Sequence, residues 1–228
     1  MRWVNDDELF DLIRNRLFTA VIGDIMDKLG MLHQFLSPAI QPLSPQMFVA
    51  GRAMPVLEED TEAGGPGQFE RTKDKPFGLM LEALDDLKKN EVYLCTGSSP
   101  RYALWGELMS VRAMKLGAAG AIVDGYSRDT KGIQALGFPV FSYGRFAQDQ
   151  APRGRVVDFR STVHIGGVRI QDGDIIVGDL DGVCVVPKQA EKEVIMSALE
   201  KAREEKLVRK ALEQGMSAGE AFKLYGIL

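Results

Sequence analysis

The stretch WGELMSVRAMKLGAAGAIVDGYSRDTKGIQALGFPVFSYG, residues 105–144, decides the fold. In and just before it, three apolar runs alternate with two helical patterns. The runs are VYLC at 92–95, AGAIV at 119–123 and FPVFSYG at 138–144, and the helical patterns lie at 106–116 and 131–136. Strands that alternate with helices pair in parallel, because each helix carries the chain back along the sheet. The stretch therefore predicts an α/β fold.

The pattern changes after residue 155. The segment IQDGDIIVGDLDGVCVVP, residues 170–187, contains short β-rich runs separated by two turn signals, Asp172-Gly173 and Asp181-Gly182. Such dipeptides favour tight hairpins. We expect antiparallel or barrel-like strands here, ending at Pro187.

Helical patterns occupy both ends of the chain. Asn5 with Glu8 is spaced as a capping box for a first helix. Thr19 is placed to cap a second helix that ends at Gly30. A long charged helix is expected over 188–213, with a favourable pair between Glu205 and Arg209. After Gly215, Ser217 and Glu220 form a second capping-box signature, for a last helix that ends near Gly226.

Between these parts, residues 46–56 predict a strand and residues 77–89 a helix. The polar, Gly-rich stretch at 57–76 lies between them and lacks periodicity, so we expect a mobile loop. Its GGPG is not followed by the Lys-Ser or Lys-Thr of a phosphate-binding loop, so a nucleotide site is not indicated.

Composition excludes several classes of function. The formal net charge is -4 and the basic residues are spread along the chain, which argues against nucleic-acid binding. No apolar segment is long enough to span a membrane, and the amino terminus does not resemble a signal peptide, so we expect a cytoplasmic protein. Cys95 and Cys184 lie in apolar runs and are expected to be reduced core thiols. With only His33 and His164 present, a histidine-based metal site or catalytic triad is not expected.

Three features are candidates for a site. A helix begins at Gly106, and the free N–H groups of its first turn would attract an anion. Arg128 and Asp129 follow the next strand, at the same expected sheet edge. Arg128 is suited to holding an anion or a developing enolate, and Asp129 to binding a hard divalent ion such as Mg²⁺. Glu107, at the helix start, is suited to positioning a metal-bound water and acting as a base.

Each feature also has a purely structural explanation. The helix start is equally compatible with a plain loop-to-helix junction, and Glu107 with a favourable partner of the helix dipole. Adjacent opposite charges such as Arg128 and Asp129 are common on loops. The expected convergence of the three features at one edge is what favours a functional site.

The stretch at 105–144, together with GGVRIQDGDIIVGDLDGVCVVP at 166–187, resembles the RraA-like family. That family contains the regulator of ribonuclease activity A and the class II 4-hydroxy-4-methyl-2-oxoglutarate aldolases. The resemblance implies a three-layer β/β/α swivelling fold over residues 17–187, with helical extensions at 1–16 and 188–228. It also implies a homo-oligomer, trimeric or hexameric, with active sites between subunits. A carboxylate from a neighbour's carboxyl-terminal region would complete each site.

The resemblance further implies a divalent-metal-dependent lyase that forms a pyruvate enolate from a small 2-oxo acid. The substrate would be of the 4-hydroxy-4-methyl-2-oxoglutarate or the oxaloacetate type, so the activity would be that of an aldolase or a decarboxylase. Backbone amides at Gly106, Glu107, Leu108 and Met109 would bind its carboxylate. Arg128 would contact the substrate, Asp129 would bind Mg²⁺ or Mn²⁺, and Glu107 would act with a metal-bound water. The alternatives are a non-enzymatic regulator that binds ribonuclease E and a structural oligomer with a relict site.

Overall fold

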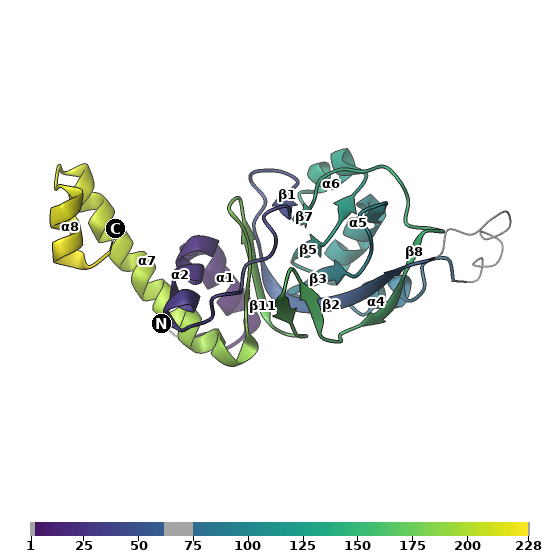
Figure 1. Ribbon diagram of the computed structural model, residues 1–228, viewed down its shortest axis with the longest axis horizontal. Helices are drawn as coiled ribbons and strands as arrows, with labels where there is room; N and C mark the ends of the chain where they lie inside the picture. The colour runs from purple at the N-terminus through teal and green to yellow at the C-terminus, as the bar shows by residue number, and fades with distance from the viewer. Residues whose placement is uncertain (1–2, 62–74, 228) are drawn as a thin grey trace.

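A large mixed β-sheet forms the centre of the computed structural model, which describes residues 3–61 and 75–227 (Figure 1). Its strands run in the order β1-β7-β5-β3-β2-β11-β12, with β8 paired to β2. Their bounds are β1 Gln41–Pro42, β2 Val49–Asp60, β3 Glu91–Thr96, β5 Gly120–Val123, β7 Val140–Ser142, β8 Gly154–Phe159, β11 Ile175–Asp179 and β12 Gly182–Val186.

The central strands are parallel, as the strand–helix rhythm predicts. β2 pairs with β3, β3 with β5, and β5 with β7 in this sense. The hairpin of β11 and β12 is antiparallel, and so is that of β9 (Val163–Ile165) and β10 (Val168–Ile170). Both parts of the strand prediction are therefore confirmed.

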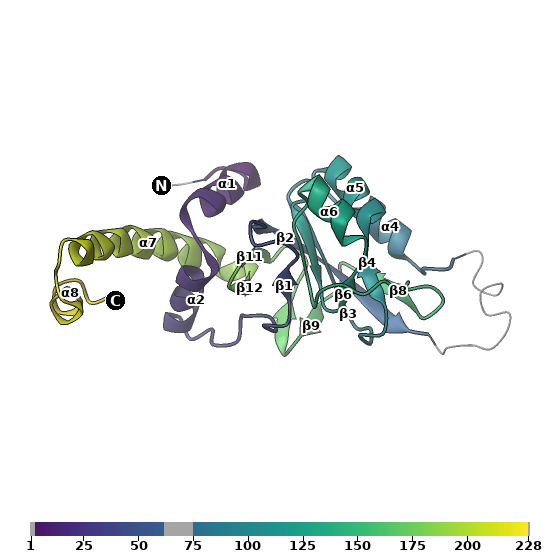
Figure 2. The same cartoon turned by 90° about the horizontal axis from the view of Figure 1, so that it is seen from above.

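Helices and strands cover opposite faces of this sheet. Helices α4 (Met80–Asp85), α5 (Glu107–Leu116) and α6 (Thr130–Leu136) lie together on one face, and the β9–β10 hairpin lies on the other (Figure 2). One hydrophobic core fills both interfaces, with Ala83 and Ala113 from the helices and Val163 and Ile170 from the hairpin. The three-layer α/β fold expected from the resemblance is confirmed.

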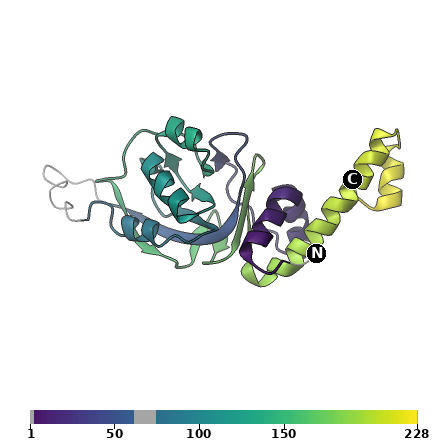
Figure 3. The same cartoon turned by 180° about the vertical axis from the view of Figure 1, so that it is seen from behind.

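A second core lies at the β11–β12 edge of the sheet. Helices α1 (Asp6–Arg16), α2 (Thr19–Lys28) and α7 (Glu191–Glu213) pack there against Ile175 and Val177, and α8 (Ala218–Tyr225) continues beyond α7 (Figures 1 and 3). Arg52 of β2 ties the two ends of the chain together, because its guanidinium pairs with Asp6 and Glu191.

The helix caps agree with the sequence only in part. Ser217 and Glu220 form the predicted capping box, and Asn5 accepts a hydrogen bond from the Glu8 amide. The carboxylate of Glu8, however, accepts from Val4 and not from Asn5. Thr19 does not cap α2: its hydroxyl donates to Asp179 at 2.7 Å, and Phe18 occupies the cap position without a side-chain bond.

Other boundaries differ from the predictions because of long-range pairing. Strand β2 continues to Asp60, into the predicted loop, because its last residues pair with β8; residues 62–74 of that loop lie outside the described part. The helix expected over 77–89 is shorter, at 80–85. Arg209 pairs with Glu213, so the predicted Glu205 pair is wrong. Within the described residues, no helix is both long and apolar enough to cross a bilayer.

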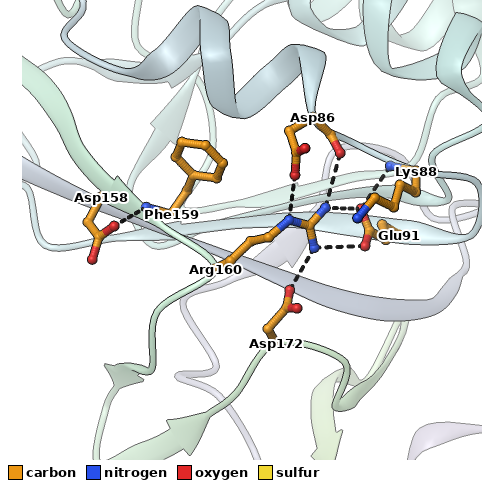
Figure 4. Close-up of polar contacts among 7 residues, drawn as sticks. All are labelled: Asp86, Lys88, Glu91, Asp158, Phe159, Arg160 and Asp172. Carbon is orange, nitrogen blue, oxygen red and sulfur yellow. Dashed lines mark hydrogen bonds and ion pairs between the residues drawn. The ribbon is translucent and has the colours of Figure 1, made fainter.

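Arg160, which directly follows β8, connects its own segment to three others (Figure 4). Its guanidinium pairs with Asp86 after α4, with Glu91 at the start of β3 and with Asp172 in the turn before β11. The contacts to Glu91 are 2.9 Å and use two nitrogens, the geometry in which arginine binds a carboxylate most strongly. Arg160 thus acts as a polar clamp between the helical layer and the sheet.

Candidate functional site

The loops after β3 and β5 meet at one edge of the sheet. The amide N–H of Arg128 donates to the carbonyl of Trp105 at 2.9 Å, and the amide N–H of Glu107 donates to Oδ2 of Asp129 at 3.2 Å. Because β3 and β5 are parallel neighbours, the segments that follow them emerge side by side. The predicted convergence of the α5 start with the Arg-Asp pair is therefore present.

Asp129 adopts an uncommon backbone conformation. Its φ of 57° and ψ of 32° place it in the left-handed region, which costs a non-glycine residue free energy. It occupies the cap position of α6, but its side chain does not cap that helix. The carboxylate turns instead toward the tip of α5, so the conformation aims the charge away from its own helix.

Gly106 makes room for that carboxylate. A Cβ added at Gly106 would lie 2.8 Å from Oδ2 of Asp129, closer than side chains tolerate. The φ of Gly106 is -145°, which any residue adopts, so the requirement for glycine here is space and not backbone conformation.

The first turn of α5 keeps free donors. The amide of Glu107 is used by Asp129, whereas the amides of Leu108 and Met109 have no hydrogen-bond partner among the described residues. Ser110 links this turn to β4. Its hydroxyl accepts a hydrogen bond from the Trp105 indole at 2.7 Å and donates one to the Gly106 carbonyl at 3.1 Å. The amides of Leu108 and Met109 are therefore left to donate to an anion, as the first turn of a helix can.

Arg128 lies between two carboxylates. Its Nη1 is 3.1 Å from Oδ1 of Asp149, and its Nε is 3.8 Å from Oδ2 of Asp129. Asp149 was not predicted as a site residue. It comes from the polar run FAQDQAPRG at 146–154, which has no periodicity or motif to single it out.

These groups line a pocket of about 370 Å³. Gly106, Leu108, Met109, Arg128 and Asp129 of the predicted set belong to it. The rest of the lining comes from α4 and the segment before it, from β4 (Ala103–Trp105) and from the loop before β8. In chain order, these lining residues are Phe77, Met80, Leu81, Leu84, Ala103, Leu104, Trp105, Asp149 and Gln150. Glu107 is not in the lining, because its carboxylate lies against α6, where a Cβ on Gly132 would meet it at 2.3 Å.

A buried carboxylate lies behind the pocket. Glu58 of β2 is 2% exposed and accepts a hydrogen bond from the amide of the pocket residue Gln150. Burial raises the pKa of Glu58 to about 8, and its Oε1 has no hydrogen-bond partner within residues 3–61 and 75–227. The sequence did not reveal it, because Glu58 falls in a polar stretch that reads as loop. It is buried because β2 extends to Asp60 and Glu58 shares the inward face of Met54 and Val56.

The donor set suits one class of metal ion. Among residues 3–61 and 75–227, no three His, Cys, Asp or Glu side chains gather to hold a metal ion, so a site built wholly from such side chains is not indicated. Asp129 and Asp149 are hard oxygen ligands, both line the pocket, and both border on open volume. Magnesium commonly binds one or two protein carboxylates and keeps several waters as its other ligands. The carboxylates of Asp129 and Asp149 are compatible with such a site.

Comparisons with known proteins agree with the sequence motifs. A protein of Halalkalibacterium halodurans, provisionally named 4-hydroxy-4-methyl-2-oxoglutarate aldolase, is 30% identical over 90% of this chain and 89% of its own length. An uncharacterized protein of Pseudomonas syringae pv. tomato has the same fold, with a TM-score of 0.82, 26% identity and coverage of 99% and 98% of the two chains.

RraAS2 of Streptomyces coelicolor, described as an unusual member of the RNase ES inhibitor RraA family, has a TM-score of 0.74 at 24% identity. Its alignment covers 91% of this chain and 99% of its own. At 24% identity, this similarity is evidence for a shared fold and not for a shared function. The family model described as "RraA-like: Aldolase/RraA" matches residues 19–185, and the chain belongs to the RraA-like family.

Proposed function

We propose that this protein is a divalent-metal-dependent lyase that cleaves a C–C bond of a small 2-oxo acid and passes through the enolate of pyruvate. The observation that carries the proposal is the joining of Asp129 and the α5 tip in one pocket with Arg128. A carboxylate, a guanidinium and free amides are the groups needed to bind a 2-oxo acid through a hard cation and to stabilise its enolate.

The α5 tip would bind the substrate carboxylate. The amides of Leu108 and Met109, which have no partner among the described residues, would present partial positive charge to that carboxylate, and Gly106 would allow its close approach. Arg128 would donate to the oxygen at C2, where negative charge develops as the bond breaks. An interaction of this kind commonly contributes roughly 3 to 4 kcal/mol to transition-state stabilisation.

The resident cation would be held by Asp129, with Asp149 as a further candidate ligand. When bound, Mg²⁺ or Mn²⁺ would polarise the keto group of the substrate as a Lewis acid. The Glu107 amide donates to one carboxylate oxygen of Asp129, which supports this role because the other oxygen would be left to coordinate the cation.

Cleavage of a 4-hydroxy-2-oxo acid also requires a proton acceptor. The proton leaves the C4 hydroxyl, the C4–O bond becomes a carbonyl as the C3–C4 bond breaks, and the C4 fragment leaves as a second oxo compound. The electron pair of the broken bond enters the enolate, which takes up a proton at C3 to give pyruvate. Glu107 is the acceptor that the sequence predicts, although its carboxylate would have to rotate away from Gly132 to serve. Asp149, the candidate ligand that lines the pocket, is the alternative acceptor. Decarboxylation of oxaloacetate passes through the same enolate.

Pyruvate release tests the proposal. The full chain, with Mg²⁺, is incubated with 4-hydroxy-4-methyl-2-oxoglutarate, 4-hydroxy-2-oxopentanoate or oxaloacetate, and pyruvate is measured by a coupled reduction. We expect turnover with at least one substrate and its loss with chelator or in Arg128→Ala. No pyruvate from any of the three would refute the lyase proposal. Binding to ribonuclease E without turnover would favour the regulator instead.

A further inference from the structure

Glu58 is a buried carboxyl group that the proposed mechanism does not use. It is 2% exposed, and it shares the inward face of β2 with Met54 and Val56, which belong to the hydrophobic core. A carboxyl group in such a place loses its hydration, which costs free energy unless hydrogen bonds offset the loss. Its Oε2 accepts a hydrogen bond from the side-chain amide of Gln150, and Gln150 lines the pocket. The buried acid is thereby connected to the candidate site.

Gln150 is held through both its backbone and its side chain. Its backbone carbonyl accepts from the amides of Arg153 at 2.6 Å and Gly154 at 3.0 Å, and its own backbone amide donates to Oδ1 of Asp149 at 2.8 Å. The side chain is anchored by Glu58 and is almost completely buried. Ordering a long glutamine side chain costs rotamer entropy. The bond to Glu58 meets that cost before a ligand arrives, which is how a binding group becomes preorganised.

The anchored amide retains hydrogen-bonding capacity for a ligand. An amide NH₂ group has two hydrogens and the carbonyl oxygen accepts, whereas a hydroxyl group both donates and accepts and can pair with either end. Within residues 3–61 and 75–227, the bond to Glu58 is the one that the Gln150 side chain makes. Its second N–H and its oxygen can therefore serve a ligand. Asp149, one of the two candidate acceptors of the C4 hydroxyl proton, directly precedes Gln150 and lines the same pocket.

We infer that Gln150 recognises the hydroxyl group at C4 of the substrate, and that Glu58 is the positioning residue that holds its amide for this contact. The inference rests on the proposed function, since it assumes that Asp129 and the α5 tip hold the 2-oxo acid. It assigns substrate selectivity to the loop before β8. That loop favours 4-hydroxy-2-oxo acids over compounds without the hydroxyl group, such as oxaloacetate.

A matched ligand pair that cannot be cleaved tests the contact. 2,4-Dihydroxypentanoate and 2-hydroxypentanoate differ only in the hydroxyl group at C4, and neither has the keto group that aldol cleavage requires. Ligand-observed NMR titrations of the full chain with Mg²⁺ should show the dihydroxy compound binding at least about fivefold more tightly, the effect of one hydrogen bond. Equal affinity, or no measurable binding of either compound, would overturn the inference.

Variants separate the roles of the two residues. Gln150→Leu should abolish the preference, and so should Glu58→Met, which replaces the acid by an apolar side chain of similar length. The double variant should show no further loss, because Glu58 acts through Gln150. Glu58→Gln retains an acceptor for the amide and should retain the preference. Glu59→Met, at a side chain of the same strand that is 44% exposed, is the matched control and should also retain it.

Each result decides one part of the inference. A preference that survives in Gln150→Leu would refute the contact with the hydroxyl group, and one that survives in Glu58→Met would refute the positioning role. A purely structural role for Glu58 would lower the melting temperature and leave the ratio of the two affinities unchanged. Glu58→Asp, which withdraws the carboxyl group by one methylene, takes the place of Glu58→Met if that variant does not fold.

The binding experiment is independent of turnover, because neither compound can release pyruvate. A preference that is present when no substrate releases pyruvate would remove the lyase and leave the recognition of the hydroxyl group standing. Pyruvate release without the preference would do the reverse.

Discussion

The amide of Glu107 and the carboxylate of Asp129 are joined by a hydrogen bond of 3.2 Å, although 22 residues separate them in the chain. The bond links the start of α5 to the start of α6, and thereby the loops that follow two neighbouring parallel strands. It holds Asp129 against the same helix tip that offers its remaining amides to an anion.

Arg128→Ala should lower kcat by about 10²–10³, the effect of removing one donor to a developing oxyanion. The Arg128 side chain is 37% exposed and its ion pairs lie at the pocket surface, so the melting temperature should change little. Steady-state kinetics with a cleaved substrate and calorimetry on the same sample measure both. Near-normal kcat would contradict the role given to Arg128.

Gly106→Ala should impair metal binding and turnover together, because the new Cβ would lie 2.8 Å from Oδ2 of Asp129. The matched control is Gly219→Ala, which meets no atom within 4 Å, has no unusual φ and lies within a helix. Titration with Mn²⁺, followed by electron paramagnetic resonance, reports on the metal separately from catalysis. Wild-type Mn²⁺ affinity in Gly106→Ala would argue against Asp129 as ligand.

Asp149→Asn and Glu107→Gln should separate the two candidate proton acceptors. Replacement of the acceptor should lower kcat on a 4-hydroxy-2-oxo acid by about 10²–10⁴, the usual contribution of general acid–base catalysis. Oxaloacetate has no C4 hydroxyl proton to lose, so its decarboxylation should suffer less. Two variants with unchanged kcat would exclude both residues.

Glu58 should make the free energy of unfolding depend on pH. The pKa of Glu58 is about 8 in the folded protein and 4.5 ordinarily. Between these two pH values, Glu58 is protonated in the folded protein and ionised in the unfolded chain. This contribution to stability is fully present below about pH 4.5 and is lost as pH rises through about 8, on the order of a few kcal/mol. Chemical denaturation at several pH values should show a flatter curve for Glu58→Gln than for the control Glu59→Gln.

Arg160→Ala should destabilise the fold by about 3 kcal/mol, because it leaves the nearly buried Glu91 without its cation. Arg209→Ala removes an arginine whose side chain is 80% exposed and should change stability by less than about 0.5 kcal/mol. Denaturant titration compares the two. Equal effects would show that the clamp in Figure 4 contributes no more than a surface pair.

The sequence predicted the parts of the site that depend on local pattern. A helix start and an Arg-Asp pair, each following one of two successive strands, must emerge at the same edge when the strands are parallel. Asp149, Gln150 and Glu58 could not be found in this way. They come together through the antiparallel pairing of β8 with β2 and its bulge, a contact across about a hundred residues that no local signal encodes.

The same distinction explains the error at Thr19. Its position fits a helix cap, but its hydroxyl and amide both donate to Asp179, 160 residues away. The Asp179 carboxylate accepts from both groups, Thr19 becomes the first residue of α2, and Phe18 takes the cap position. The local sequence pattern therefore mispredicted the cap, because the tertiary fold brings the distant Asp179 next to Thr19.

Strand β2 is shared by both hydrophobic cores. Ala50 belongs to the one built with the terminal helices, whereas Met54 and Val56 belong to the one beneath α4 and α5, and Glu58 stands next to the pocket. Neither core can lose its packing without releasing a strand that the other requires. Heat should therefore melt the sheet and the helices packed on β11 and β12 in a single cooperative transition, with equal calorimetric and van't Hoff enthalpies.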